Sequence, residues 1–109
     1  MELLKTEFVE GDPAVLLVDG EIDLSTAEQL RTALQEALAA DPKVVVDMAG
    51  VTFCDAAGLR VVLQVAASRD GAGPLELLNA PRVARILELL RLSESTSIVI
   101  RDGNEEHGR

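Results

Sequence analysis

Side chains capable of acid–base or nucleophilic chemistry gather in two short segments of the chain. Asp55 directly follows Cys54, and Asp23 lies in an earlier segment just before Ser25 and Thr26. Two carboxylates can share acid and base roles, and a thiolate can act as a nucleophile. Neither segment supplies a histidine or lysine that would activate the thiol. A small enzyme built on Asp23, Cys54 and Asp55 is therefore an alternative that lacks a recognisable acid–base set.

Metal and cofactor chemistry finds little support in the residue types. Cys54 is the single cysteine and His107 the single histidine, so the chain can form neither an internal disulfide nor a cysteine–histidine metal cluster. No glycine-rich phosphate loop of the Walker type is present. We expect no metal, no cofactor and no catalysis, and we expect Cys54, beside Phe53, to be buried and inert.

The stretch from Val44 to Arg60 must position Cys54 and Asp55. It opens with a β-branched run at 44–46, which predicts a strand buried on both faces, followed by a glycine-containing turn. After Asp55, apolar residues recur at helical spacing. Aspartate is a preferred helix N-cap, because its carboxylate accepts a backbone N–H of the first turn. The pattern predicts strand, short loop and a helix capped by Asp55.

Hydrophobic patterns along the rest of the chain predict five strands and three helices. We expect strands at 3–9, 14–20, 43–48, 75–78 and 96–100. We expect helices from Ser25 to about Asp41, from 56 to about 69, and beginning near Pro81. The order β-β-α-β-α-β-α-β predicts one α/β domain over 1–109, with a mixed, mostly parallel sheet, an initial antiparallel hairpin and a mobile tail at 101–109.

Polar residues before two of the helices suggest how they start. Ser25 and Glu28 have the spacing of a capping box. Asn79 precedes Pro81, so Asn79 is a candidate cap and the proline is tolerated in the first turn.

Composition narrows the classes of partner. Of the 109 residues 48% are hydrophobic, and 19 acidic against 10 basic residues give a net charge of −9. Binding to nucleic acid or anionic lipid relies on Lys and Arg, so this balance argues against both and favours a partner with a basic patch. No apolar run reaches about 18 residues, and the N-terminus lacks the layout of a signal peptide. We expect a cytoplasmic protein without membrane insertion.

Two motifs in this sequence resemble the signature of the STAS domain family, the bacterial anti-sigma factor antagonists. The family pattern is an apolar strand ending in Asp, a short apolar loop, then Asp-Ser-Ser/Ala-Gly-Leu opening a helix. The matching residues are Asp47, Val51, Phe53, Asp55, Gly58 and Leu59. The segment Gly20-Glu21-Ile22-Asp23 matches the family's Gly-Glu-Leu/Ile-Asp turn. The family also shows the predicted order of elements, so the resemblance spans nearly the whole chain.

The resemblance implies a protein that binds an anti-sigma factor of the serine kinase type and thereby frees a sigma factor. It places the contact surface in the loop and helix around Asp55. The contact residues expected from it are Asp23, Thr26, Thr52, Asp55, Ala56, Gly58, Leu59 and Arg60. Ala56 stands where the family carries its phosphorylated serine, so this chain has no phosphoacceptor at that position and the family's switch is missing there.

Other interpretations remain open. The chain could serve as a STAS accessory subunit of a membrane transporter's ATPase complex, or as a diverged interaction module of the same family. Thr52 is the best substitute phosphoacceptor among the remaining hydroxyls, whereas Ser25 is better explained as a helix cap.

Overall fold

A computed structural model describes residues 2–69, 71–92 and 97–102. The described residues form five strands and three helices in the predicted order β-β-α-β-α-β-α-β. Their bounds are β1 Leu4–Val9, β2 Val15–Ile22, α1 Ala27–Ala40, β3 Val45–Cys54, α2 Ala56–Ala67, β4 Leu75–Leu78, α3 Pro81–Leu89 and β5 Ile98–Arg101. Most of the expected tail, 103–109, and the expected strand start at Thr96 lie outside the described residues.

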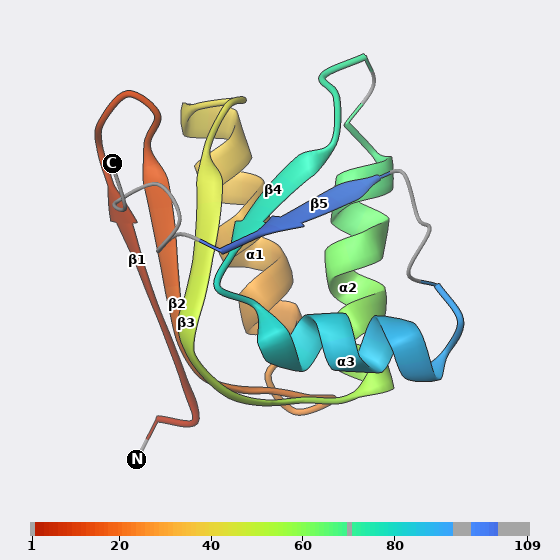
Figure 1. The fold of residues 1–109 in the computed structure, drawn as a ribbon. Helices are drawn as coiled ribbons and strands as arrows, with labels where there is room; N and C mark the ends of the chain where they lie inside the picture. Colours follow the sequence, from red (N-terminus) through yellow and green to blue (C-terminus); the bar gives the residue numbers. More distant parts are fainter. Residues whose placement is uncertain (1, 70, 93–96, 103–109) are drawn as a thin grey trace.

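The strands form one mixed sheet in the order β1-β2-β3-β4-β5. β1 and β2 pair antiparallel, which confirms the predicted hairpin, and every later neighbour pairs parallel. Strands β4 and β5 pass in front of α1 and α2, which pack against each other, and α3 crosses α2 near the end of the sheet (Figure 1). The carboxyl ends of the parallel strands therefore point to one end of the molecule.

The core lies between the sheet and the helices. Alternating strand residues are fully buried on the helix-covered face, namely Leu16, Val18, Val46, Met48, Leu75 and Leu77. The residues that alternate with them, such as Leu17, Asp47 and Leu78, share the other face and are half-buried. The prediction of burial on both faces is confirmed for 44–46 but does not extend along the whole of β3, because its second face is partly open.

β3 is longer than predicted, and this changes the description of the segment before Asp55. The strand ends at Cys54 rather than Met48, so the expected glycine turn and loop are part of the strand. Two register shifts against β2 let it continue, since each places one extra β3 residue in the ladder. At the first shift a Cβ on Gly50 would collide with the Asp19 carboxylate. Thus Thr52 and Phe53 are strand residues, in the part of β3 whose pairing with β2 is irregular, rather than loop residues.

Two predicted helix caps are wrong. The N-cap of α1 is Thr26, not Ser25, and its side chain makes no capping bond. The Ser25 hydroxyl instead donates to Asp23 Oδ1 at 2.7 Å, which removes it from the helix. The N-cap of α3 is Ala80. Asn79 is one residue earlier, in a left-handed conformation with φ 55°, and its amide donates to Asp47 Oδ1 at 3.4 Å.

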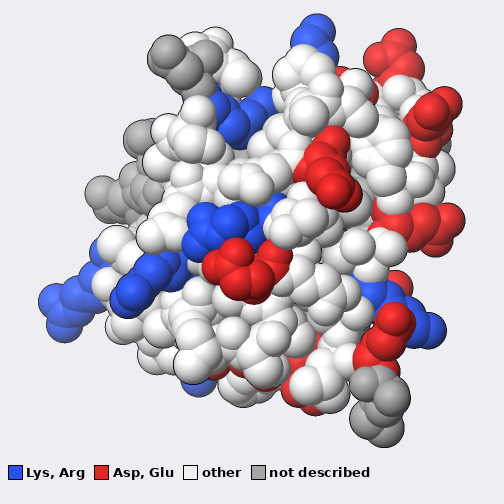
Figure 2. All heavy atoms as spheres, turned by 180° about the vertical axis from the view of Figure 1, so that it is seen from behind, with Lys and Arg blue, Asp and Glu red and all other residues white. Residues whose placement is uncertain are grey.

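Charge is unevenly spread over the molecule. Figure 2 shows the face that α1 and α2 cover: Lys and Arg gather over the half where α2 lies, and most Asp and Glu lie over the other half. Within the described ranges no helix is long and apolar enough to cross a membrane.

Candidate partner-binding site

The structure brings the two predicted contact segments together at the carboxyl ends of β2 and β3. Ile22 and Cys54 are paired in the parallel ladder. The Asp55 backbone N–H donates to the Ile22 carbonyl at 3.1 Å. The 22–26 segment and the start of α2 are therefore neighbours, as their motifs implied.

Asp55 caps α2 as predicted. Its Oδ1 accepts the Gly58 N–H at 2.9 Å, which satisfies one amide that the helix start would otherwise leave unpaired. Ala56 is the first residue of the helix, and its side chain is exposed. The cap thus holds a small, uncharged side chain at the surface next to Ile22.

Gly58 holds the helix start against the end of β2. A Cβ at this position would lie 2.8 Å from the Ile22 carbonyl oxygen and would collide with the Ile22 side chain. Glycine is therefore required by packing inside the molecule.

Asp23 organises the turn between β2 and α1. Its Oδ1 accepts the Ser25 N–H at 2.9 Å, the Ser25 hydroxyl, and the Thr26 N–H at 3.2 Å. The bond from the Ser25 hydroxyl is the largest influence on the pKa of Asp23 and lowers it from 3.8. Desolvation acts in the opposite direction and raises the pKa, and the backbone hydrogen bonds lower it further. Thr26 closes the turn by donating its hydroxyl to the Glu21 carbonyl at 2.8 Å.

The expected contact residues divide by exposure. Thr52, Ala56 and Arg60 are exposed, and Asp23 and Asp55 are half-buried. Thr26, Gly58 and Leu59 are buried, and Leu59 is only 1% exposed. These three residues shape the site from inside, and their contact with a partner stays a prediction.

Two apolar residues at this end were missed as contact candidates. Leu24 is 78% exposed between Asp23 and Ser25, and Phe53 is 48% exposed next to Cys54. The sequence carried a signal for both: a leucine inside a polar turn, and one of two aromatic residues in the chain. Exposed apolar side chains beside polar ones are typical of protein interfaces.

Cys54 is unsuited to nucleophilic chemistry. Burial raises the pKa of the Cys54 thiol from 9.0 to about 11, and the negative charge of Asp55 adds to the rise. The reactive species is the thiolate, which this site disfavours. Within the described ranges no group of three or more His, Cys, Asp and Glu side chains could hold a metal ion.

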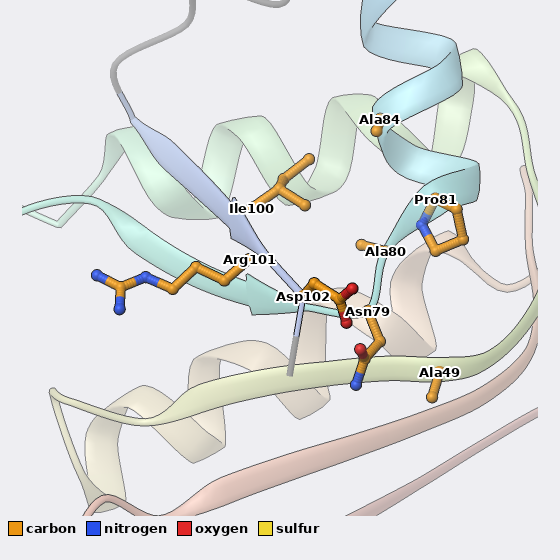
Figure 3. Close-up of a pocket in the computed structure, with 8 residues that line it drawn as sticks. All are labelled: Ala49, Asn79, Ala80, Pro81, Ala84, Ile100, Arg101 and Asp102. Atoms are coloured by element: carbon orange, nitrogen blue, oxygen red, sulfur yellow. The ribbon is translucent and has the colours of Figure 1, made fainter. Parts of the chain in front are cut away.

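A separate cavity of about 540 Å³ opens at the start of α3. Its lining residues are Ala49, Asn79, Ala80, Pro81, Ala84, Ile100, Arg101 and Asp102. Arg101 extends away from the other lining side chains (Figure 3), and it pairs with Glu76 at 3.5 Å. None of the expected contact residues lines this cavity.

Comparison with known proteins agrees with this architecture. A family model described as "Mlab, STAS domain" matches residues 8–101. The chain is a member of the STAS domain family. The structure of an anti-sigma factor antagonist from Mycobacterium paratuberculosis superposes with a TM-score of 0.78, at 23% identity over 94% of this chain and 89% of that one.

A second structure shows the same STAS fold. A Thermotoga maritima protein provisionally described as an anti-sigma factor antagonist matches with a TM-score of 0.67. Its identity is 19%, and the match covers 97% of this chain and 92% of that one. At these identities the likeness establishes the fold, whose order of strands and helices is the one predicted from the sequence.

Proposed function

We propose that this STAS domain is an anti-sigma factor antagonist that binds its partner through the surface around Ala56. One observation carries the proposal. The exposed Ala56 begins a capped helix directly beside the end of β2, where the Asp55 N–H meets the Ile22 carbonyl. The two motifs that resemble the family's contact segments therefore form one continuous surface.

The chemistry of this surface suits protein recognition. Leu24 and Phe53 offer apolar area, and Asp23 and Asp55 offer carboxylates to a basic patch on the partner. The carboxylates are already oriented by the turn and the helix cap, so little side-chain freedom is lost on binding. Interaction rather than catalysis is the proposed activity, in the cytoplasm, with an anti-sigma factor that is also a serine kinase.

Ala56 makes this binding insensitive to phosphorylation at that position. A phosphoryl group on a serine there would add about two negative charges beside Asp55. The alanine has no hydroxyl to modify, so the surface stays in its uncharged state. The proposed antagonist is therefore constitutively competent to bind.

A capture experiment tests the proposal. The tagged protein is used to capture partners from its native host, with Ala56→Asp as the charged variant and Ala72→Asp as the control at an exposed alanine outside the site. An acidic residue in the first turn favours a helix, so Ala56→Asp should fold normally. We expect wild type and Ala72→Asp to retain a kinase-type anti-sigma factor that Ala56→Asp loses. Capture of a transporter's ATPase instead would favour the accessory-subunit alternative.

The kinase part of the proposal has its own test. The captured anti-sigma factor is incubated with ATP and either wild type or Ala56→Ser, and phosphopeptides are mapped by mass spectrometry. We expect modification of residue 56 in the serine variant alone. Modification of Thr52 in the wild type would show that another hydroxyl provides the switch.

A further inference from the structure

An apolar groove runs along the exposed side of α2. Its volume is about 350 Å³, and it is lined by Ala56, Leu59, Arg60, Leu63, Gln64, Ala67, Leu90 and Leu92. The α2 residues recur at helical spacing from its first residue to its last, a length of about 16 Å. Leu90 and Leu92, both exposed, form the opposite wall. A groove of this length and composition fits one face of an amphipathic helix.

The wall formed by Leu90 and Leu92 is held by a defined turn. Leu92 N–H donates to the Leu87 carbonyl at 2.7 Å, and Arg91 N–H donates to the Glu88 carbonyl at 3.1 Å. These two bonds, with Arg91 at φ 60°, form the Schellman motif that ends α3. The motif favours glycine at the left-handed position, yet the chain has an arginine there. The turn thus presents two leucines to the groove, with the arginine between them in the chain.

The groove carries a basic side chain, although the molecule as a whole is acidic. The chain carries a net charge of −9, but exposed Arg60 lines the groove, and exposed Arg91 lies in the chain between the lining residues Leu90 and Leu92. Arg31 also lies beside α2, since its guanidinium donates to Gln64 Oε1 at 2.8 Å, and it pairs with Glu28 Oε2 at 3.4 Å. Figure 2 shows this gathering of basic side chains over the α2 half of the face. A segment lying here gains from apolar residues in the groove and acidic residues at its margins.

We propose that the groove binds an acidic amphipathic helix of the anti-sigma factor. The groove is continuous with the surface around Ala56, because Ala56 and Arg60 belong to both. This inference rests on the proposed function for the identity of the partner. The groove would be a second contact, and it would favour acidic side chains where the first contact favours basic ones. The partner would therefore present a basic patch to Asp23 and Asp55 and an acidic helix to the groove.

A designed peptide probes the groove directly. The peptide carries leucines at every third or fourth position and glutamates on the flanking faces, and a second peptide has lysines in place of the glutamates. Binding is followed by NMR of the leucine methyl groups. We expect the glutamate peptide to shift the Leu63, Leu90 and Leu92 signals and the lysine peptide to bind at least about tenfold more weakly. Equal binding of both peptides, or shifts confined to other leucines, would overturn the proposal.

Variants separate the groove from the fold. Two variants should each raise the Kd for the glutamate peptide at least about tenfold: the double variant Leu90→Ser/Leu92→Ser and the single variant Arg91→Gly. The matched controls are Leu89→Ser and Arg82→Ala, both exposed and outside the groove, and they should bind as wild type. Unchanged binding in the groove variants would contradict the assignment.

The captured anti-sigma factor then distinguishes the two proposals. If Ala56→Asp abolishes its binding and the groove variants leave it unchanged, the proposed function stands and the groove is not part of the interface. If no anti-sigma factor binds the wild type but the glutamate peptide seats in the groove, the function fails and the acidic-helix site stands with a different partner.

Discussion

At the residue scale, small side chains in the first turn of α2 have two different causes. Gly58 is set by packing, because the Ile22 carbonyl leaves no room for a Cβ. Ala56, two residues earlier, is exposed and is not constrained by neighbouring atoms in this way. The fold therefore demands glycine at 58 and tolerates serine at 56. Packing therefore does not account for the missing hydroxyl at residue 56.

The packing of Gly58 predicts a loss of stability on substitution. Gly58→Ala should lower the free energy of unfolding by about 1–3 kcal/mol, because the carbonyl it meets is backbone and cannot rotate away. This loss exceeds the roughly 1 kcal/mol that alanine gains over glycine in a helix. Urea denaturation measures the change, with exposed Arg60→Ala as a control expected within about 0.5 kcal/mol of wild type. A stabilised Gly58→Ala variant would contradict the close approach of α2 to β2.

The raised pKa of Cys54 predicts slow thiol chemistry. At pH 8 native Cys54 should react with iodoacetamide about a hundredfold more slowly than in guanidinium, since its pKa lies near 11 instead of 9.0. The reaction rate should rise with pH until about 11. The protonated thiol contributes stability that is fully present below pH 9.0 and is lost as the pH rises through about 11. Rapid labelling of the native protein at pH 8 would show that the thiol is accessible and ionised.

Residue-scale roles were predictable where one local rule applied without competition. Asp55 precedes a helical pattern and caps it as expected. Ser25 also has a capping pattern, yet the Asp23 carboxylate takes its hydroxyl and the helix starts at the following residues. The sequence offers several partners to each polar side chain in that turn, and only the folded backbone decides between them.

At the scale of elements, the start of α2 has a structural role in capping the helix and, in the proposed function, a second role in recognition. Asp55→Ala should lower stability by about 1 kcal/mol through loss of the cap, whereas Asp55→Asn should keep most of it because asparagine caps nearly as well. Asp55→Asn should nevertheless weaken binding to the anti-sigma factor, since the negative charge of the carboxylate is lost. Thermal denaturation and calorimetric titration separate the two effects. Unchanged affinity in Asp55→Asn would limit the side chain to its capping role.

The end of α3 predicts a trade between stability and binding. Arg91 lies at φ 60°, where a non-glycine residue costs roughly 1 kcal/mol. Arg91→Gly should therefore raise Tm by about 4 °C, even though it weakens binding of the glutamate peptide. Arg82→Ala, inside α3, gives the reference for loss of an exposed arginine. A lowered Tm in Arg91→Gly would mean that the arginine side chain itself stabilises the turn.

Element boundaries were harder to predict than element types. The sequence predicts that β3 ends at Met48, because Gly50 indicates a turn, but the strand continues to Cys54 through two register shifts. Such shifts depend on what the neighbouring strand presents, here Asp19 and Gly20 on β2. That information is not local in the chain. The groove beside α2 was unpredictable for the same reason, since its second wall comes from the turn after α3.

At the scale of the whole molecule, the order of elements determined the arrangement of the site. Each strand and helix carries its own hydrophobic period, so five strands and three helices could be predicted in sequence order. Because β2 and β3 are adjacent and parallel, their carboxyl ends bring the 22–26 segment beside α2. The net negative charge indicated a partner with a basic patch. The fold, however, gathers basic side chains on one half of a face and acidic side chains on the other half.

The most direct test of the account is a calorimetric titration of the captured anti-sigma factor into wild type, Ala56→Asp and Ala72→Asp. A charge placed in the contact surface should raise Kd by at least about tenfold in Ala56→Asp, with Kd unchanged in Ala72→Asp. Equal Kd values for wild type and Ala56→Asp would show that the exposed start of α2 is not the surface that binds the partner.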